Sequence, residues 1–317
     1  MICLGVMKRM MKALVHGNLS KRVKLRASSI AQISQRIVQC ANYFPVEFSR
    51  RPRGLQDLAH YKGTEFRNLV LYLGPHCFKG VLYPELYRNF LLFTSGIYIL
   101  LSPKASDLAM NELANKLLRK FVKDSASHYG LQFVVYNVHN LIHISRDCLN
   151  YGSLDNFDAF GFETYMQTLK RYVRGKKHSL QQVVARMSEY ESLNKRDANV
   201  CGFVNKSQRR KYKYKNVMFS VNDGDNCFLT KNLSVIVITG LESIENGIVK
   251  CKRFKLQDNV AEYPVDSRLL CIFRCKSFWP EESIDVKGIL KKCVCLPDFE
   301  DGNYFICYPL FFDIDHM

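Results

Sequence analysis

The sequence has no run of apolar residues long enough to cross a bilayer. Its most apolar stretch, residues 89–102, is shorter than the ~20 residues that a membrane-spanning helix needs. We therefore expect a buried core helix there and no membrane partner. The sequence also lacks the phosphate-binding Walker loop, the serine nucleophile elbow and the glycine fingerprint of dinucleotide-binding folds. These absences exclude several common classes of nucleotide-binding protein and hydrolase.

Acidic residues are missing from residues 1–46, and the charge of the whole chain is uneven. Residues 1–216 hold 35 Lys and Arg against 14 Asp and Glu, a net +21, whereas residues 217–317 hold 11 against 15, a net −4. Such a basic surplus favours nucleic-acid binding, because cations that neutralise phosphates release condensed counterions. A merely solubilising surface is the alternative. The acid-free start also has the composition of a mitochondrial transit peptide.

The twelve cysteines are irregularly spaced in a chain that is 47% hydrophobic. A chain of this length and composition can bury a core without disulfide staples. We therefore expect the cysteines to be reduced thiols that are buried or have no specific role, as in the reducing nucleus or cytoplasm.

Apolar periodicity predicts a mainly helical region over residues 1–193. Leu113, Leu117 and Phe121 recur at helical spacing between residues 106 and 130. A second apolar stripe runs over residues 58–73 and should end at the Gly-Pro pair of residues 74–75. A third covers residues 180–187. We expect all three stripes to face a core.

Short β-branched and aromatic runs begin at about residue 217 and predict a small β-rich domain over residues 217–317. The predicted strands are residues 217–221, 234–239, 247–255, 269–275 and 304–308, with a turn at residues 222–225. The polar, basic residues 194–216 between the two regions are interpreted as a linker. The expected fold class is α+β.

Two basic segments are candidates for binding nucleic acid. The first places Lys170, Arg171 and Arg174 on one face of a helix, followed by three further basic residues, Lys176, Lys177 and His178. The second interleaves two tyrosines, which could stack on bases, with cations. Its candidate residues are Arg209, Arg210, Lys211, Lys213 and Lys215. A nuclear-import signal and a solvated linker remain alternatives for the second segment.

His139 and His143 lie one helical turn apart and could hold zinc if Cys148 or His76 supplied a third ligand. The glutamate of a metalloprotease HExxH motif is absent, which excludes that class. A packing or hydrogen-bonding role is the alternative for the pair.

Glu163 stands among aromatic residues, where a carboxylate is costly unless it is paired or holds a metal. It is therefore a candidate functional residue, with an ion pair as the alternative.

Several segments together resemble the region downstream of the catalytic core in CACTA (En/Spm-type) DNA transposases and the transposase-domain proteins derived from them. The most specific are Asn-Val-His-Asn-Leu-Ile-His at residues 137–143 and Phe-Gly-Phe-Glu-Thr-Tyr at 160–165, which runs into Leu-Lys-Arg at 169–171. Residues 44–53 and 63–67 also match, in the same order. The resemblance covers about residues 1–190.

This resemblance implies that the helical region is the C-terminal part of an RNase H-like core, whose acidic triad holds two Mg²⁺ or Mn²⁺ ions. Glu163 would be the third triad carboxylate, with His139 and His143 supporting it. Residues 1–8 resemble the continuation of an Asp-x-Met-His segment. Both catalytic aspartates are then expected upstream of residue 1, and the chain alone is expected to be catalytically incomplete.

Three functions follow as hypotheses. The first is a transposase-derived nuclear protein that binds nucleic acid, DNA above all, without cleaving it. The second is a truncated form of an active DDE-type transposase. The third is a scaffold protein that docks a protein partner through its C-terminal β domain, with a basic solubilising surface.

Overall fold

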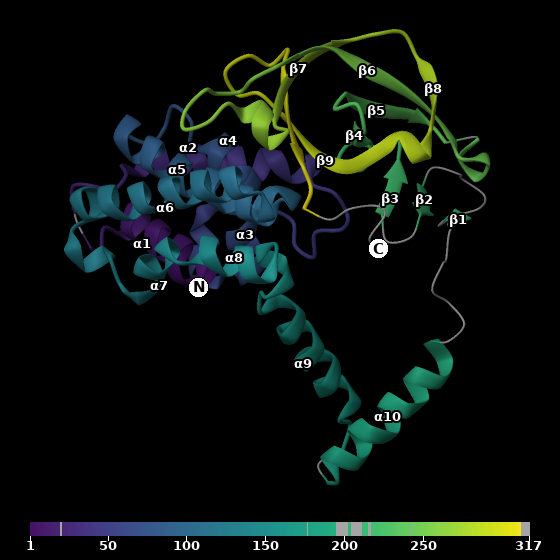
Figure 1. The fold of residues 1–317 in the computed structure, drawn as a ribbon, viewed down its shortest axis with the longest axis horizontal. Helices are drawn as coiled ribbons and strands as arrows, with labels where there is room; N and C mark the ends of the chain where they lie inside the picture. Colours follow the sequence, from purple (N-terminus) through teal and green to yellow (C-terminus); the bar gives the residue numbers. More distant parts are fainter. Residues whose placement is uncertain are drawn as a thin grey trace.

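The computed structural model describes residues 1–19, 21–175, 177–194, 202–203, 211–214, 217–241 and 243–311. Helices dominate the first part of the chain and antiparallel strands the second, so the predicted α+β class is confirmed. Figure 1 shows a layer of packed helices with a curved sheet lying against it, and α9 and α10 projecting away from both.

The helical part is built around two long helices that pack along each other. The helices are α1 (Lys8–His16), α2 (Ala27–Gln39), α3 (Gly63–Asn68), α4 (Gly74–Cys77), α5 (Pro84–Leu101), α6 (Leu108–Tyr129), α7 (Tyr136–His139), α8 (Ile144–Tyr151), α9 (Phe160–Tyr172) and α10 (Ser179–Asn194). Helix α5 is buried along most of its length, which confirms the predicted core helix. No helix in the described ranges is long and apolar enough to span a membrane.

Helix α6 begins and ends where its sequence signals indicate. The Asp107 carboxylate accepts a hydrogen bond from the Met110 N–H at 2.9 Å and caps the first turn. Gly130 follows the last residue with a φ of +90°, a region that favours glycine. Close approach to α5 depends on Gly96, since a Cβ there would lie 2.7 Å from Cγ of Leu118. The two helices therefore share one tightly packed core.

The prediction that the Gly-Pro pair ends the second helical stripe is wrong. A π-helical turn, Leu69–Leu73, leads directly into α4, and Gly74 has helical torsions. Pro75 has no N–H to donate within this helical run, and the π-helical turn directly before it is the local departure from α-helical geometry. Gly74 is needed for another reason: a Cβ there would lie 2.5 Å from the ring of Phe90 on α5.

The strands form a closed antiparallel sheet and a smaller one beside it. They are β1 (Gly202–Phe203), β2 (Lys211–Tyr214), β3 (Val217–Ser220), β4 (Cys227–Thr230), β5 (Val235–Gly240), β6 (Ile248–Asp258), β7 (Phe273–Phe278), β8 (Glu282–Asp285), β9 (Ile289–Pro297) and β10 (Phe305–Pro309). The large sheet has the order β5-β4-β9-β10-β7-β6-β8, and pairing of β5 with β6 closes it into a barrel. Strands β1, β2 and β3 form the smaller sheet.

The predicted strands all have counterparts, with shifted ends. The largest shift is at residues 269–275, where a 3₁₀ turn, Ser267–Leu270, precedes β7. Strands β4, β8 and β9 have no predicted counterpart, and β1 and β2 lie inside the range interpreted as a linker. In β2, Tyr212 is buried and the next residue, Lys213, is exposed, so this part of the predicted linker shows the alternation of a strand.

The helical and β parts share one core. Val294, Leu296 and Tyr308 from the barrel belong to the same buried cluster as the side chains of α5 and α6. Buried Tyr98 on α5 donates a hydrogen bond to the carbonyl oxygen of Pro309 at 3.1 Å. Because the cluster is continuous, the two parts pack as one body.

A buried ion cluster, made of Lys292, Glu47 and Asp225, also joins the two parts. The Lys292 Nζ lies 2.8 Å from a Glu47 oxygen and 2.7 Å from an Asp225 oxygen, and it donates to the carbonyl oxygen of Met218 at 2.8 Å. Its side chain is fully buried. Glu47 also accepts from the Met218 N–H, and Asp225 from the Val46 N–H. Every charge in the cluster is therefore paired and hydrogen bonded.

Candidate functional site

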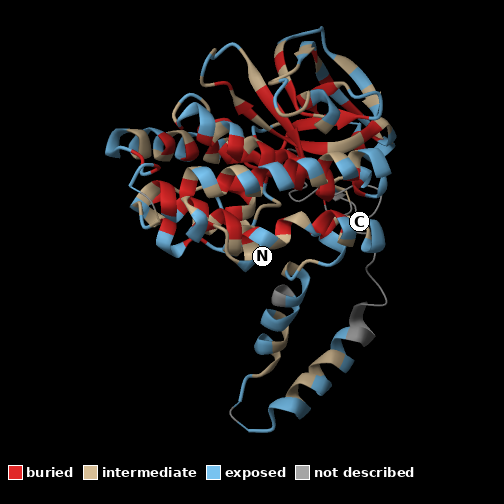
Figure 2. Ribbon diagram, turned by 60° about the vertical axis from the view of Figure 1, so that its left-hand side comes forward, coloured by how far each residue is buried: buried red, intermediate tan, exposed pale blue. Residues whose placement is uncertain are grey.

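Helices α9 and α10 form an arm that projects from the body of the protein. Figure 2 colours this arm mainly as exposed and intermediate, in contrast to the red core of the body. The two helices touch each other only weakly, and the Tyr165 hydroxyl lies 3.9 Å from the sulfur of Met187. The arm therefore has little core of its own.

The prediction that residues 180–187 face a core is wrong. Leu180 is 74% exposed and Val184 is 55% exposed. Their helical spacing is real, but α10 leaves the body and packs weakly against α9, so these side chains stay exposed among the described residues. The arm also exposes aromatic side chains, including Phe162 at 74%.

The turn at the end of the arm carries the first predicted set of cations. Lys170 and Arg171 lie in the last turn of α9, and Arg174 and Lys177 lie in the loop before α10; all four are exposed. Arg171 donates to the Thr168 hydroxyl at 3.1 Å. None of the four forms an ion pair with any residue that the structure describes. We call these four residues the arm tip; Lys176 lies outside the described residues.

The side chain of Gln182 holds the arm-tip loop in shape. Its carbonyl oxygen accepts from the N–H groups of Arg174 and Gly175, at 2.9 and 3.0 Å. Its amide donates to the carbonyl oxygens of Gly175 and Lys177, at 3.2 and 2.6 Å. These four hydrogen bonds from one side chain fix the loop that presents the cations.

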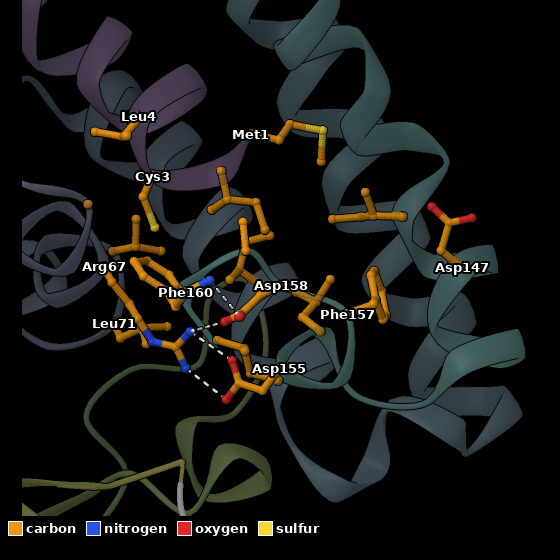
Figure 3. Close-up of a pocket in the computed structure, with 18 of the residues that line it drawn as sticks. Met1, Cys3, Leu4, Arg67, Leu71, Asp147, Asp155, Phe157, Asp158 and Phe160 are labelled. Carbon is orange, nitrogen blue, oxygen red and sulfur yellow. Dashed lines mark hydrogen bonds and ion pairs between the residues drawn. The ribbon is translucent and has the colours of Figure 1, made fainter. Parts of the chain in front are cut away.

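A cavity of about 470 Å³ lies at the base of the arm. Apolar side chains make up most of its wall, and Arg67, Asp155 and Asp158 lie together on one side of it, as Figure 3 shows. The apolar lining is contributed by Ile2, Leu4, Val70, Leu71, Ile97, Leu101, Ile144, Leu154, Phe157 and Phe160. Because α9 starts at Phe160, the cavity wall and the root of the arm are the same element.

Arg67 anchors the root of the arm through two carboxylates. Its guanidinium binds both oxygens of Asp155, at 2.7 and 2.8 Å, and lies 3.6 Å from Asp158. Asp158 in turn accepts the Phe160 N–H at 2.9 Å, in an Asx turn that leads into α9. Burial raises the pKa of Asp158, although Arg67 and the backbone N–H of Phe160 oppose this shift. The sequence resemblance included Arg67, but no periodic signal links it to residues 155 and 158.

The charged groups of this cavity do not form an activated nucleophile. Burial raises the pKa of the Cys3 thiol to about 11, so the thiol stays protonated at neutral pH. His143 is exposed, and Asp147 lies on α8, apart from the ion pairs of Arg67 (Figure 3). Among the described lining residues, no hydrogen bond joins a histidine to Cys3. Asp155 and Asp158, paired with Arg67, therefore hold the start of α9 in place.

The two histidines of the predicted zinc pair lie together at the surface. The ring centroids of His139 and His143 are 5.6 Å apart. Cys148 is buried behind them and its thiol points to the carbonyl oxygen of Leu100. His76 lies elsewhere, bonded to the carbonyl oxygen of Pro297 at 2.9 Å. Within the described ranges, the only group of three or more potential metal ligands is made of cysteines in the barrel.

The predicted carboxylate site for Mg²⁺ or Mn²⁺ falls partly outside the described residues. Glu163 lies in α9, but its side chain is outside them. The described carboxylates just before α9 in the chain, Asp155 and Asp158, are engaged by Arg67. The described residues thus do not fit a two-metal centre.

Only residues 211–214 of the second predicted basic segment lie within the described residues. Lys211 and Lys213 lie on one face of β2, and Tyr212 on the other, buried in a cluster with Val217 and Phe219. Tyr212 is therefore not available to stack on a base, contrary to the sequence-based expectation, because strand alternation turns it inward. Arg209, Arg210 and Lys215 lie outside the described residues.

A known family model matches the β part of the chain. Residues 195–310 match the family described as "Domain of unknown function (DUF8592)". This range starts just after α10 and covers the smaller sheet and the barrel. No curated protein and no solved structure matches the chain. The match thus marks the β part as a recurring domain and leaves the helical part and the arm unassigned.

Proposed function

We propose that this protein is a transposase-derived nuclear protein that binds nucleic acid, duplex DNA first of all, through the arm tip. The observation that carries the proposal is the group of four exposed cations that have no acidic partner among the described residues. Their place at the end of a projecting arm leaves them free to approach a phosphate backbone.

Unpaired cations matter more for such binding than paired ones. On α6, Lys116 lies 2.9 Å from Glu112 and Lys120 lies 3.1 Å from Asp124. These lysines already have an anion beside them, so a phosphate gains less from their charge. Each arm-tip cation that meets a phosphate releases counterions and steepens the salt dependence of the affinity.

Binding without cleavage is the form of the function that we propose. The resemblance to CACTA transposases supports this proposal for the helical region and its histidines, and the net +21 of residues 1–216 favours attraction to a polyanion. The described carboxylates at the root of the arm are used by Arg67. The proposal therefore includes no strand cleavage by this chain alone.

The test uses the whole chain, since its two parts share one core. Lys170, Arg171, Arg174 and Lys177 are replaced together by Ala, and fluorescence anisotropy measures binding to a labelled duplex at low salt. The matched control removes four ion-paired cations of the body, Lys79, Lys116, Lys120 and Arg268. We expect the arm-tip variant to lose at least tenfold in affinity and the control to lose much less. Equal losses would show that only net charge matters, and the arm tip would then not be the site.

Exposed apolar side chains on the arm favour a second candidate function, which is docking of a protein partner. Phe162, Leu180 and Val184 are more exposed than apolar side chains on a surface helix usually are. Replacement of these three by Ser should abolish capture of such a partner and leave DNA affinity unchanged. A loss of DNA affinity in this variant would instead assign the apolar face to nucleic-acid binding.

A further inference from the structure

Five cysteine thiols gather inside the barrel. They come from β4 (Cys227), β7 (Cys275), β9 (Cys293 and Cys295) and β10 (Cys307). All five are free thiols; four are buried, and Cys295 is partly exposed. They share the core cluster with a few large apolar side chains such as Phe254 and Leu229.

Strand alternation explains how residues from four strands meet. Strands β4, β9, β10 and β7 are consecutive neighbours in the sheet. Cys293 and Cys295 are two residues apart, so they point to the same face of β9. Val294 and Leu296 point to the opposite face and pack on the helical part. On β10, Cys307 is the direct cross-strand partner of Cys295.

Three of the thiols lie close enough to bind one ion. The Sγ atoms of Cys227, Cys295 and Cys307 all lie within 4.8 Å of one another. The Cys295 and Cys307 sulfurs are 3.3 Å apart. The thiol of Cys293 interacts with that of Cys227, and the thiol of Cys275 with that of Cys307, so one further thiol lies beside the trio at each end, outside its 4.8 Å grouping.

These separations fit the dimensions of a thiolate metal centre. A zinc–sulfur bond of about 2.3 Å places the sulfurs of a tetrahedral site roughly 3.8 Å apart. The trio reaches this arrangement by side-chain adjustments of less than about 1 Å at each sulfur, on the same bond length. Thiolate ligands select soft or borderline d¹⁰ ions and disfavour Mg²⁺ and Mn²⁺.

We propose that Cys227, Cys295 and Cys307 bind one zinc ion in the barrel, with Cys293 as the fourth ligand. Binding exchanges protons for metal: four neutral thiols and Zn²⁺ give a tetrathiolate complex of charge −2 and four released protons. Thiol–thiol hydrogen bonds are weak, so the metal-free cluster gains little from its own contacts. Cys295, at the partly exposed end, offers a route of entry for the ion.

This site goes beyond the proposed function, since nucleic-acid binding by the arm tip does not depend on it. The ligands lie in the domain that matches the family of unknown function, at residues 195–310. The only local sequence signal is the Cys-x-Cys pair at residues 293 and 295, because Cys307 follows twelve residues later on the next strand and Cys227 lies far earlier in the chain.

The experiment measures metal in the full chain, purified with a reductant and without chelator. We expect about one zinc per chain by elemental mass spectrometry. After the zinc is replaced by cobalt, we expect the intense thiolate-to-cobalt absorption of a tetrahedral site. Cys227→Ser, Cys295→Ser and Cys307→Ser should each lose the metal. The matched controls, Cys251→Ser on β6 and Cys148→Ser on α8, should keep it.

Measurements on the unaltered protein keep the test decisive if the serine variants fail to fold. Absence of both bound zinc and a cobalt–thiolate band in the folded wild-type chain would overturn the proposal. A disulfide between Cys295 and Cys307, found by mass spectrometry of the non-reduced protein, would overturn it as well. Loss of metal on Cys275→Ser with retention on Cys293→Ser would overturn the assignment of the fourth ligand.

Discussion

Replacement of Lys292 by methionine tests whether the buried ion cluster holds the helical and β parts together. Methionine keeps most of the aliphatic length but removes the ammonium group that binds Glu47 and Asp225. The two carboxylates are then left buried without a cation, at 13% and 6% exposure. Loss of one partner from a buried ion pair costs about 3–5 kcal/mol. The loss of the bond to the Met218 carbonyl oxygen adds to this cost.

The assay is urea unfolding followed by circular dichroism at neutral pH. The control variant, Lys79→Met, breaks the half-exposed pair with Glu300 and should cost less than about 1 kcal/mol. A triple variant, Lys292→Met with Glu47→Gln and Asp225→Asn, removes all three charges and keeps acceptors for the N–H groups of Met218 and Val46. It should be more stable than Lys292→Met alone, because no uncompensated charge remains. Equal stability of the two variants, or a cost below about 1 kcal/mol for Lys292→Met, would refute the electrostatic reasoning.

Two further predictions concern single side chains. Burial lowers the pKa of His76 to about 4, so the folded protein is stabilised by roughly 3 kcal/mol above pH ~6.5, and this stabilisation is lost as the pH falls towards 4. His76→Gln should reduce the difference in unfolding free energy between pH 7 and pH 4.5. An unchanged difference would assign the pH dependence to other groups. Arg67→Ala removes the cation between Asp155 and Asp158 and should speed chymotrypsin cleavage at the root of α9. The control Arg186→Ala breaks an ion pair within α10 and should leave the cleavage rate unchanged. Identical cleavage rates for the two variants would mean that Arg67 does not anchor the arm.

The sequence was sufficient for the features that depend on local pattern. The helix of residues 108–129 follows from its apolar spacing and the glycine after it. The change from helical to strand period near residue 217 marks the β part. These features are encoded within a few residues of where they occur, so no knowledge of distant contacts is needed.

Features that depend on distant partners could not be predicted from the sequence. The spacing of Leu180 and Val184 is that of a core helix, but only the fold reveals that α10 leaves the body and keeps them exposed. Lys292 sits in the unpredicted strand β9, and its partners lie more than sixty residues away in the chain. The predicted role of Tyr212 failed because inward orientation is set by the neighbouring strand. Long-range pairing thus decides where these residues act.

The most direct test of the proposed function is the affinity of the full chain for duplex DNA across a salt series. If the four arm-tip cations contact phosphates, log affinity should fall steeply with log salt, and the arm-tip variant should show a slope shallower by roughly 3 to 4, since each contact contributes about 0.9. The control variant, which lacks Lys79, Lys116, Lys120 and Arg268, should keep nearly the wild-type slope. Absence of binding at low salt, or the same slope in all three proteins, would contradict nucleic-acid binding by the arm.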